Sequence, residues 1–269
     1  MLASLLALAL LLSSLVPTDP PTPLTESLSS RPLSSLALRL QREPFAVTRD
    51  EAHRAAAVFG LPATEARMVL IAVDRSRALP EGYTPPDLVF VGGRQVRSLV
   101  RDDLLAMMDA AGSERVELVP ISTYRSPDQQ ELAYASAVWG AMGRGVIDRA
   151  EAESRSSRYV APPGHSQHQL GTAVDFSTWD INYAIQSAFA DTEAGRWLER
   201  HGWEYGFVLP YPSTGEERTG YAYEPWHWRW IGRELAAVMQ RDGYRDHPTL
   251  NADDYLRAAE EILNAEGIP

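Results

Sequence analysis

The histidines and carboxylates of this 269-residue chain define its metal chemistry, because the sequence has six histidines and no cysteine. A catalytic zinc site commonly combines three protein ligands with one open position for water, and histidine and carboxylate are the ligands left here. Three histidines have simpler explanations, as solvated or helix-capping side chains: His53, His201 and His247. His165, His168 and His227 remain as candidate ligands.

Asp175 lies in an apolar strand pattern between Val174 and Phe176. A carboxylate buried there costs free energy unless a cation or strong hydrogen bonds compensate it. Gly171 and Ala173 are small and allow another group to approach the backbone closely. The pattern favours a metal ligand, and a hydrogen-bonded turn or capping carboxylate is the alternative.

The segment Trp226–Trp230 alternates between tryptophan and polar residues. In a strand, the tryptophans share one face and pack into the core, while His227 points to the other face and a polar cleft. Glu224 would lie opposite His227 in a regular strand, but Pro225 favours a strand start or a kink. Glu224 can therefore reach the site, where a carboxylate can accept a proton from attacking water and return it to a leaving amine.

Two motifs together resemble the paired signature of the LAS metallopeptidases. This group includes VanY-type D,D-carboxypeptidases, VanX-type D-Ala-D-Ala dipeptidases and related L,D-carboxypeptidases. The motifs are Ser166-x-His168-x-x-Gly171-x-Ala173-x-Asp175 and Glu224-x-Trp226-His227.

A third segment, Tyr124-Arg125-Ser126 with Gln130, resembles the substrate-binding segment of the VanY branch. Residues 79–83 and 87–88 resemble the beginning of that branch's domain. The likeness covers most of residues 70–235, and it implies an α+β fold with a small central antiparallel sheet flanked by helices.

The resemblance implies a zinc-dependent carboxypeptidase that hydrolyses the C-terminal D-alanine bond of peptidoglycan stem peptides. It implies Zn²⁺ as the cofactor and Glu224 as the general base. It gives Arg125 the task of grasping the terminal carboxylate, for which a planar bidentate guanidinium is suited. The implied zinc ligands are His168, Asp175 and His227, and the implied substrate contacts are Arg125, Ser166, Gln130 and Tyr124.

Three alternatives share this fold: a D-Ala-D-Ala dipeptidase, a peptidoglycan endopeptidase and a non-catalytic cell-wall binding module. The first two differ from the carboxypeptidase in how the loops at 144–163 and 213–221 close the cleft, and Arg125 favours a substrate with a free carboxylate. The binding module would be expected to have lost a ligand or the base. D,D and L,D specificity both stay open.

Two residues near the motifs depart from the family pattern. His165 matches no ligand position, and we expect it to support a loop or a ligand rather than to contact substrate. Thr123 stands where the family more often has glycine, with little expected effect on the chemistry.

The whole chain divides into three parts. Residues 1–16 are apolar and uncharged and, as a helix, would reach ~24 Å, short of the ~30 Å hydrocarbon core. They predict a signal peptide or a membrane anchor. Residues 17–44 are rich in Pro, Ser and Thr and predict an extended linker, and 45–269 form the peptidase domain. We therefore expect an extracytoplasmic protein, secreted or anchored to the outer face of the cell membrane.

The composition, 45% hydrophobic and 23% charged, is that of a folded protein. A net charge of −11 argues against a nucleic-acid partner, which needs a basic surface. We expect a monomer. Apolar periodicity and capping residues predict an α+β chain, with helices at 48–60, 99–111, 126–142, 192–201, 232–241 and 252–263, strands at 116–123, 171–176, 205–209 and 223–231, and a loop or lid at 144–163.

Overall fold

The computed structural model describes residues 47–57, 63–244 and 252–265. The expected leader (1–16) and linker (17–44) lie outside the described residues, as do His247 and the expected end of the first helix at residue 60. Among the described residues, no helix has the length and apolar character that crossing a bilayer requires.

Short strands alternate irregularly with helices along the described chain. The elements are α3 (Arg49–Ala57), α4 (Ala63–Leu70), β1 (Leu88–Val91), β2 (Arg94–Arg97), α5 (Ser98–Ser113), β3 (Val119–Ser122), α6 (Pro127–Gly143), α7 (Arg149–Ser156), η1 (Gln167–Leu170), β4 (Ala173–Ser177), η2 (Trp179–Ile181), η3 (Ser187–Asp191), α8 (Glu193–His201), η4 (Gly202–Tyr205), β5 (Phe207–Val208), α9 (Glu216–Thr219), β6 (His227–Trp230), α10 (Arg233–Arg241) and α11 (Ala252–Ala265).

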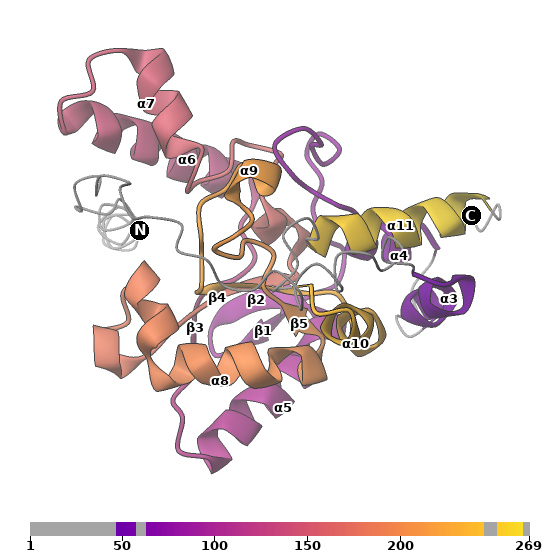
Figure 1. The fold of residues 1–269 in the computed structure, drawn as a ribbon. Helices are drawn as coiled ribbons and strands as arrows, with labels where there is room; N and C mark the ends of the chain where they lie inside the picture. The colour runs from indigo at the N-terminus through magenta and orange to yellow at the C-terminus, as the bar shows by residue number, and fades with distance from the viewer. Residues whose placement is uncertain (1–46, 58–62, 245–251, 266–269) are drawn as a thin grey trace, which may run out of the picture.

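A four-stranded antiparallel sheet in the order β3-β4-β6-β5 lies at the centre of the fold (Figure 1). Its register pairs Asp175 of β4 with His227 of β6 on one side and with Ser122 of β3 on the other. Directly paired residues project to the same face. This register therefore brings three polar side chains into one row, and the α+β architecture with a small antiparallel sheet is confirmed.

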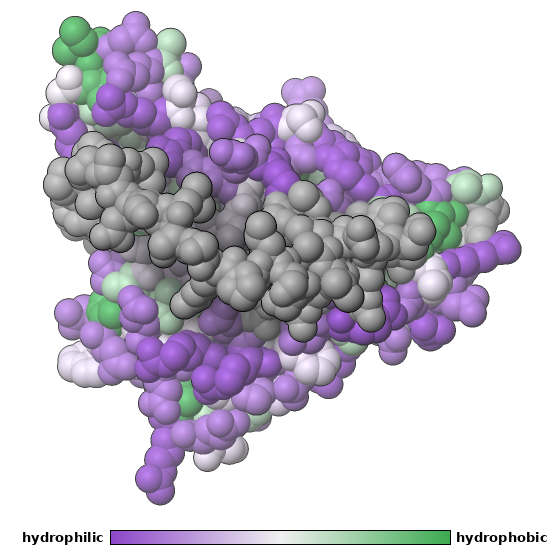
Figure 2. All heavy atoms as spheres, in the orientation of Figure 1, coloured by the Kyte–Doolittle hydropathy of each residue, from purple (hydrophilic) through white to green (hydrophobic). Residues whose placement is uncertain are grey.

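Helices surround this sheet in groups (Figure 1). Helices α3, α4, α10 and α11 pack against one another at one end, while α5 and α8 both contact η4. Helices α6 and α7 pair and project from the body as an arm. Figure 2 shows a mainly hydrophilic face, in keeping with the net charge of −11. The largest exposed apolar side chains of the described residues are Phe90, Leu105, Leu132, Trp139, Ile147 and Trp179.

The predicted alternation around His227 is confirmed in the core. Trp228 and Trp230 are buried in the main hydrophobic cluster, and Arg229 donates from the opposite face to the carbonyls of Val69 and Ile71. The strand begins only at His227, however, and not at the expected residue 223. A turn precedes it, in which the His227 N–H donates to the Glu224 carbonyl at 3.0 Å.

The expected loop at 144–163 is wrong in part, because it contains helix α7. Asp148 caps this helix by accepting from the Glu151 N–H at 2.8 Å, and an Arg149–Glu153 pair supports its exposed side. Ala152 is fully buried against α6. A helix that buries so little apolar surface shows little hydrophobic periodicity in its sequence.

Other boundaries were predicted well or missed for local reasons. The capping box at Thr48/Glu51 and the N-cap at Ser126 are present as predicted, and Gln129 completes a second capping box at Ser126. Helix α8 ends at His201 as predicted, with Gly202 as its C-cap, and Gly202 then opens η4; a Cβ on Gly202 would lie 2.8 Å from the Trp228 ring. The β1–β2 hairpin and α4 were not predicted, although Gly92-Gly93, with φ of 55° and 80°, is a recognisable two-residue hairpin turn.

Candidate active site

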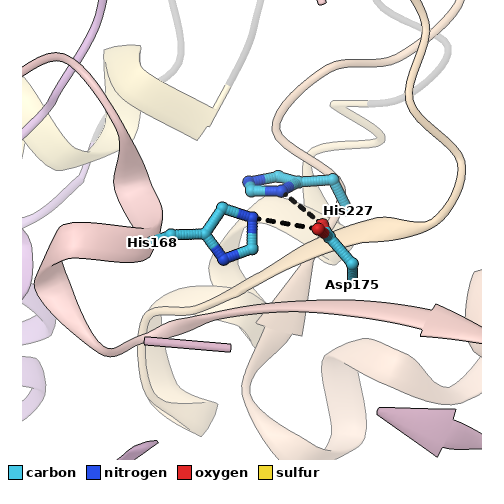
Figure 3. A group of neighbouring side chains, drawn as sticks. All are labelled: His168, Asp175 and His227. Carbon is cyan, nitrogen blue, oxygen red and sulfur yellow. Dashed lines mark hydrogen bonds and ion pairs between the residues drawn. The ribbon is translucent and has the colours of Figure 1, made fainter. Parts of the chain in front are cut away.

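Three side chains predicted as ligands meet on one face of the central sheet (Figure 3). Asp175 of β4 places one oxygen 3.1 Å from His168 Nε2 and the other 2.9 Å from His227 Nδ1. The imidazole rings lie edge to face with centroids 4.9 Å apart. All three side chains are buried, at 3–6% residue exposure. A histidine–aspartate–histidine set of this kind has the composition of a catalytic zinc site.

The outer nitrogen of each imidazole is held by an oxygen that can only accept. His168 Nδ1–H donates to the Thr123 carbonyl at 2.7 Å, and His227 Nε2–H donates to Gln167 Oε1 at 3.1 Å. The other nitrogen of each ring therefore faces the carboxylate of Asp175, within hydrogen-bonding distance. Two ring nitrogens and a carboxylate that converge in this way suit a cation once the rings are deprotonated, so the donor set fits a divalent metal.

The charges in this cluster depend on burial and on one another. Burial raises the pKa of Asp175, but the two imidazoles outweigh it and hold the pKa well below its ordinary value. Burial lowers the pKa of His227, which favours the neutral ring that a metal requires. An ionised Asp175 and a neutral His227 are the forms in which these two residues bind a metal.

A glycine turn places His168 opposite the sheet. His168 lies in the short helix η1, which ends at Gly171 with φ of 69°. A Cβ on Gly171 would lie 3.0 Å from Arg97 Cγ, and the Gly171 carbonyl accepts from the Arg97 N–H at 2.9 Å. The fully buried Arg97 is held in turn by Asp87 at 2.7 Å and Glu65 at 3.1 Å. The small residue noted in the motif thus permits a close approach of β2.

Glu224 lines the same cavity as the three candidate ligands. The turn that precedes β6 carries its side chain to the ligand side, which regular pleating from residue 223 would have prevented. Burial raises the pKa of Glu224 well above its ordinary value, the Asp175 charge adds to this, and Arg125 partly opposes it. A carboxyl group with a raised pKa is suited to accept and return a proton.

Arg125 lines the cavity beside this group. Its guanidinium donates to Gln130 Oε1 at 2.8 Å and to Ser122 Oγ at 3.1 Å. Gln130 is fully buried and itself donates to the Ala161 carbonyl at 2.6 Å. Burial lowers the pKa of Arg125, and the charges of nearby carboxylates oppose that shift. The cation is therefore oriented before any anionic ligand arrives.

The other predicted substrate contacts differ in their positions. Ser166 lines the cavity, and its Oγ accepts from the His168 N–H at 3.3 Å. Among the described cavity-lining residues, Gln130 and Tyr124 do not appear. The Tyr124 N–H instead donates to the Gln95 carbonyl at 2.9 Å. The structure thus places Gln130 behind Arg125 and ties Tyr124 to β2.

His165 and Thr123 have structural partners. The His165 ring bonds to the Asp74 carbonyl at 2.7 Å, outside the set of described residues that line the cavity. This agrees with the loop-supporting role predicted for it. Thr123 contributes the carbonyl that orients His168, so its backbone, and not its side chain, serves the ligand set.

Known proteins are similar to the part of this chain that contains the site. Residues 93–233 match the family described as VanY, D-alanyl-D-alanine carboxypeptidase. The chain belongs to the VanY family. It is 32% identical over 204 residues to the Bacillus subtilis carboxypeptidase YodJ (72% of this chain, 69% of YodJ) and 30% identical over 184 residues to an Enterococcus faecalis D-alanyl-D-alanine carboxypeptidase (68% and 66%).

Solved structures of VanY-like proteins resemble the fold. The LdcB LD-carboxypeptidase superposes with a TM-score of 0.61 at 32% identity, over 74% of this chain and 89% of LdcB. VanYB in complex with D-alanine-D-alanine gives 0.61 at 29% identity, over 70% and 97%. A VanY mutant in complex with Zn(II) gives 0.60 at 29% identity, over 70% and 99%. This VanY-family chain is a carboxypeptidase.

Sequence analysis did not identify several residues of this VanY-family site. Gln167, which binds the His227 ring, occupies an unspecified position of the first motif. Tyr211 stacks on the His227 ring with centroids 5.1 Å apart, and Tyr221 packs against Tyr211 at 4.8 Å. Gln167 could have been found from its place between Ser166 and His168, but no spacing signal marks the two tyrosines.

Proposed function

We propose that this protein is a zinc-dependent carboxypeptidase that removes the C-terminal D-alanine from peptidoglycan stem peptides. The observation that carries the proposal is the convergence of His168, Asp175 and His227 beside Glu224 and Arg125 in one cavity. A metal-ligand set, a proton acceptor and an anion-binding cation are the three components that hydrolysis of a terminal peptide bond requires.

Zinc would be held by His168 through Nε2, by His227 through Nδ1 and by the Asp175 carboxylate. When bound, it would lower the pKa of a coordinated water and polarise the scissile carbonyl. Its support comes from the converging ligand atoms of these three residues and from the similar VanY structure that contains Zn(II). The Thr123 carbonyl and the Gln167 amide would keep both rings in the required tautomer.

Glu224 would transfer the proton during hydrolysis. Its carboxylate accepts a proton from water as the water oxygen bonds to the carbonyl carbon. As the carbon–nitrogen bond breaks, the same carboxyl group gives that proton to the leaving amine. Its buried position raises its pKa, which makes the carboxylate a stronger proton acceptor.

Arg125 would select the end of the substrate. A guanidinium can bind a carboxylate through two parallel hydrogen bonds, and here Gln130 and Ser122 hold it in position. Ser166, at the start of η1, would add a hydrogen bond to the peptide. A substrate without a free carboxylate would leave the Arg125 charge poorly compensated, so a terminal residue is favoured over an internal bond.

Product analysis on defined stems tests the proposed substrate. Mass spectrometry should show loss of one alanine from a pentapeptide stem for D,D specificity, or from a tetrapeptide stem for L,D specificity. Both VanYB and LdcB are similar in fold, so both stems belong in the assay. Release of an intact dipeptide, or cleavage of cross-links, would contradict the proposal.

We also propose that the protein acts outside the cytoplasm and as a monomer. The support is the uncharged apolar run at 1–16 followed by the Pro/Ser/Thr-rich segment at 17–44. Fusion of residues 1–44 to a reporter that is active only after export should give activity, and a cytoplasmic reporter should not. Light scattering on purified protein should give a mass near 29.8 kDa, less any leader that is removed.

A further inference from the structure

A loop beside the cavity displays two aromatic side chains that the proposed chemistry does not use. It begins after β4, which carries Asp175, and leads into Ile185, which lines the cavity. Trp179 is 67% exposed in this loop. Its ring meets the ring of Tyr183 edge to face, with centroids 6.1 Å apart. Both ends of the loop therefore adjoin the cavity, and an exposed indole lies between them.

The loop is held in place by one carboxylate. Glu117 accepts from the Trp179 N–H at 2.7 Å and from the Tyr183 hydroxyl at 3.1 Å. Asn182 and Tyr183 have φ of 52° and 57°, a left-handed conformation that is uncommon for a tyrosine. Hydrogen bonds to Glu117 and a left-handed backbone therefore fix the position of the two aromatic rings on the surface.

The surroundings of Trp179 are polar. Asp180 and Asn182 are both exposed in the same loop, so hydrogen-bonding side chains flank the indole. A docking face for an apolar protein or lipid partner would be expected to continue into further apolar surface. A sugar ring matches this pattern better, because it offers C–H groups on one face and hydroxyl groups around its edge.

The stem peptide is long enough to reach this loop. Trp179 follows Asp175 by four residues, which span at most about 14 Å when extended. In a pentapeptide stem, four amino acids separate the terminal scissile bond from the sugar, and their greatest reach is the same ~14 Å. If Arg125 holds the terminal carboxylate, a stem leaving over Ile185 brings its sugar to this loop.

We infer that Trp179, with Tyr183, forms a saccharide subsite that binds the muramyl sugar carrying the stem peptide. The inference rests on the proposed function and deepens it. It assigns the enzyme a preference for stems still attached to glycan over free peptides. Because stacking on the sugar is the same before and during hydrolysis, the preference should appear in KM and not in kcat.

The test compares two substrates in the zinc-loaded, full-length protein: a free pentapeptide stem and the same stem on an N-acetylglucosaminyl-N-acetylmuramyl disaccharide. We expect kcat/KM to be about tenfold higher for the glycan-linked stem. In Trp179→Ala this ratio should fall to about one, and Trp179→Phe should keep part of it. Trp139→Ala is the matched control, because Trp139 is 65% exposed on α6 and should leave the ratio at the wild-type value.

Binding of the disaccharide without peptide, followed by saturation-transfer NMR, separates this inference from the proposed function. Wild type and Trp139→Ala should show transfer to the sugar, and Trp179→Ala should not. An equal kcat/KM for both substrates, or transfer that Trp179→Ala retains, would overturn the subsite while leaving the carboxypeptidase intact. If neither stem is hydrolysed, the proposed function fails and the NMR result alone decides the subsite.

Discussion

The pKa values of two buried aspartates are shifted in opposite directions, and the neighbours of each aspartate explain the difference. Asp175 lies between two imidazoles, which hold its pKa well below the ordinary value against the effect of burial. Asp253 faces Arg229 at 3.9 Å, and there burial outweighs the attraction and raises the pKa to about 6. Equal burial therefore gives a ligand in one place and a destabilised charge in the other.

Replacing Glu224 by glutamine should remove the proton acceptor and leave the ligand set in place. We expect kcat/KM to fall by about 10²–10⁴-fold, the usual contribution of a general base, with zinc content unchanged. Elemental analysis and a muropeptide hydrolysis assay measure the two quantities. Glu204→Gln, at a position that pairs with His201 on the surface, is the control. Wild-type turnover in Glu224→Gln would show that another group takes the proton.

Asp253 should give the folded protein a pH dependence that the variant Asp253→Asn lacks. Its folded pKa of about 6 lies above the reference value of 3.8, so its contribution to stability is complete below about pH 3.8 and is lost as the pH rises through 6. The unfolding free energies of wild type and variant should therefore diverge by up to about 3 kcal/mol between pH 4 and pH 7. Urea unfolding across that range measures this, with the exposed Asp50→Asn as control.

At the scale of elements, short connections place the reactive side chains. The η1 helix delivers His168 because Gly171 turns the chain with a positive φ against Arg97. The turn before β6 delivers Glu224 to the side of His227. Strands β4 and β6 add the register that sets Asp175 opposite His227. The ligands thus come from one short helix and two adjacent strands, and the sheet holds them together.

Gly171→Ala should disturb this arrangement more than a strained glycine elsewhere. The added Cβ meets both a positive φ and atoms at 3.0–3.1 Å, whereas Gly93, with φ of 80°, has no atom within 4 Å. Gly93→Ala should cost about 1–2 kcal/mol from backbone strain alone. Gly171→Ala should cost more and should also weaken zinc binding through His168. Thermal melts and zinc titrations measure both effects, and equal behaviour of the two variants would contradict the crowding argument.

At the scale of the whole molecule, the site joins segments that are far apart in the sequence. His168 and His227 are separated by 59 positions, and the loop at Asp74 that supports His165 is tied to α11 by Arg257 and by an Arg77–Glu260 pair. Helix α11 lies beyond the residues matched by the VanY family, 93–233. The body around the site is therefore larger than the family match.

A metal that bridges distant segments should stabilise the whole fold. Chelation should abolish hydrolysis and lower the Tm by about 5–10 °C, because zinc at a hundredfold excess over its Kd contributes about 2.7 kcal/mol. Calorimetry with and without added zinc measures the shift. His227→Ala should lose it, and His201→Ala, whose ring faces Glu204, should keep it. A zinc-dependent Tm shift in His227→Ala would place the metal elsewhere.

The candidate ligands, the base and the α+β class could be predicted from the sequence, with His168 and Glu224 predicted mainly through the family resemblance. Asp175 was marked by a carboxylate among apolar residues, and His227 by alternation with tryptophans that the core confirms. These signals depend only on residues that are neighbours in the sequence, so they can be recognised without the fold. The polar helix α7 was not predicted, because a capping residue and a charge pair stabilise it more than an apolar face does.

Which atoms face one another depends on the tertiary structure. The Thr123 carbonyl and Gln167 amide select the imidazole tautomers, Gln130 stands behind Arg125, and Tyr211 covers His227. No spacing rule could give these contacts, because they depend on strand register and on loops that approach through space. Sequence supplied the chemical groups, and the packing of β3, β4 and β6 with their connecting turns supplied their geometry.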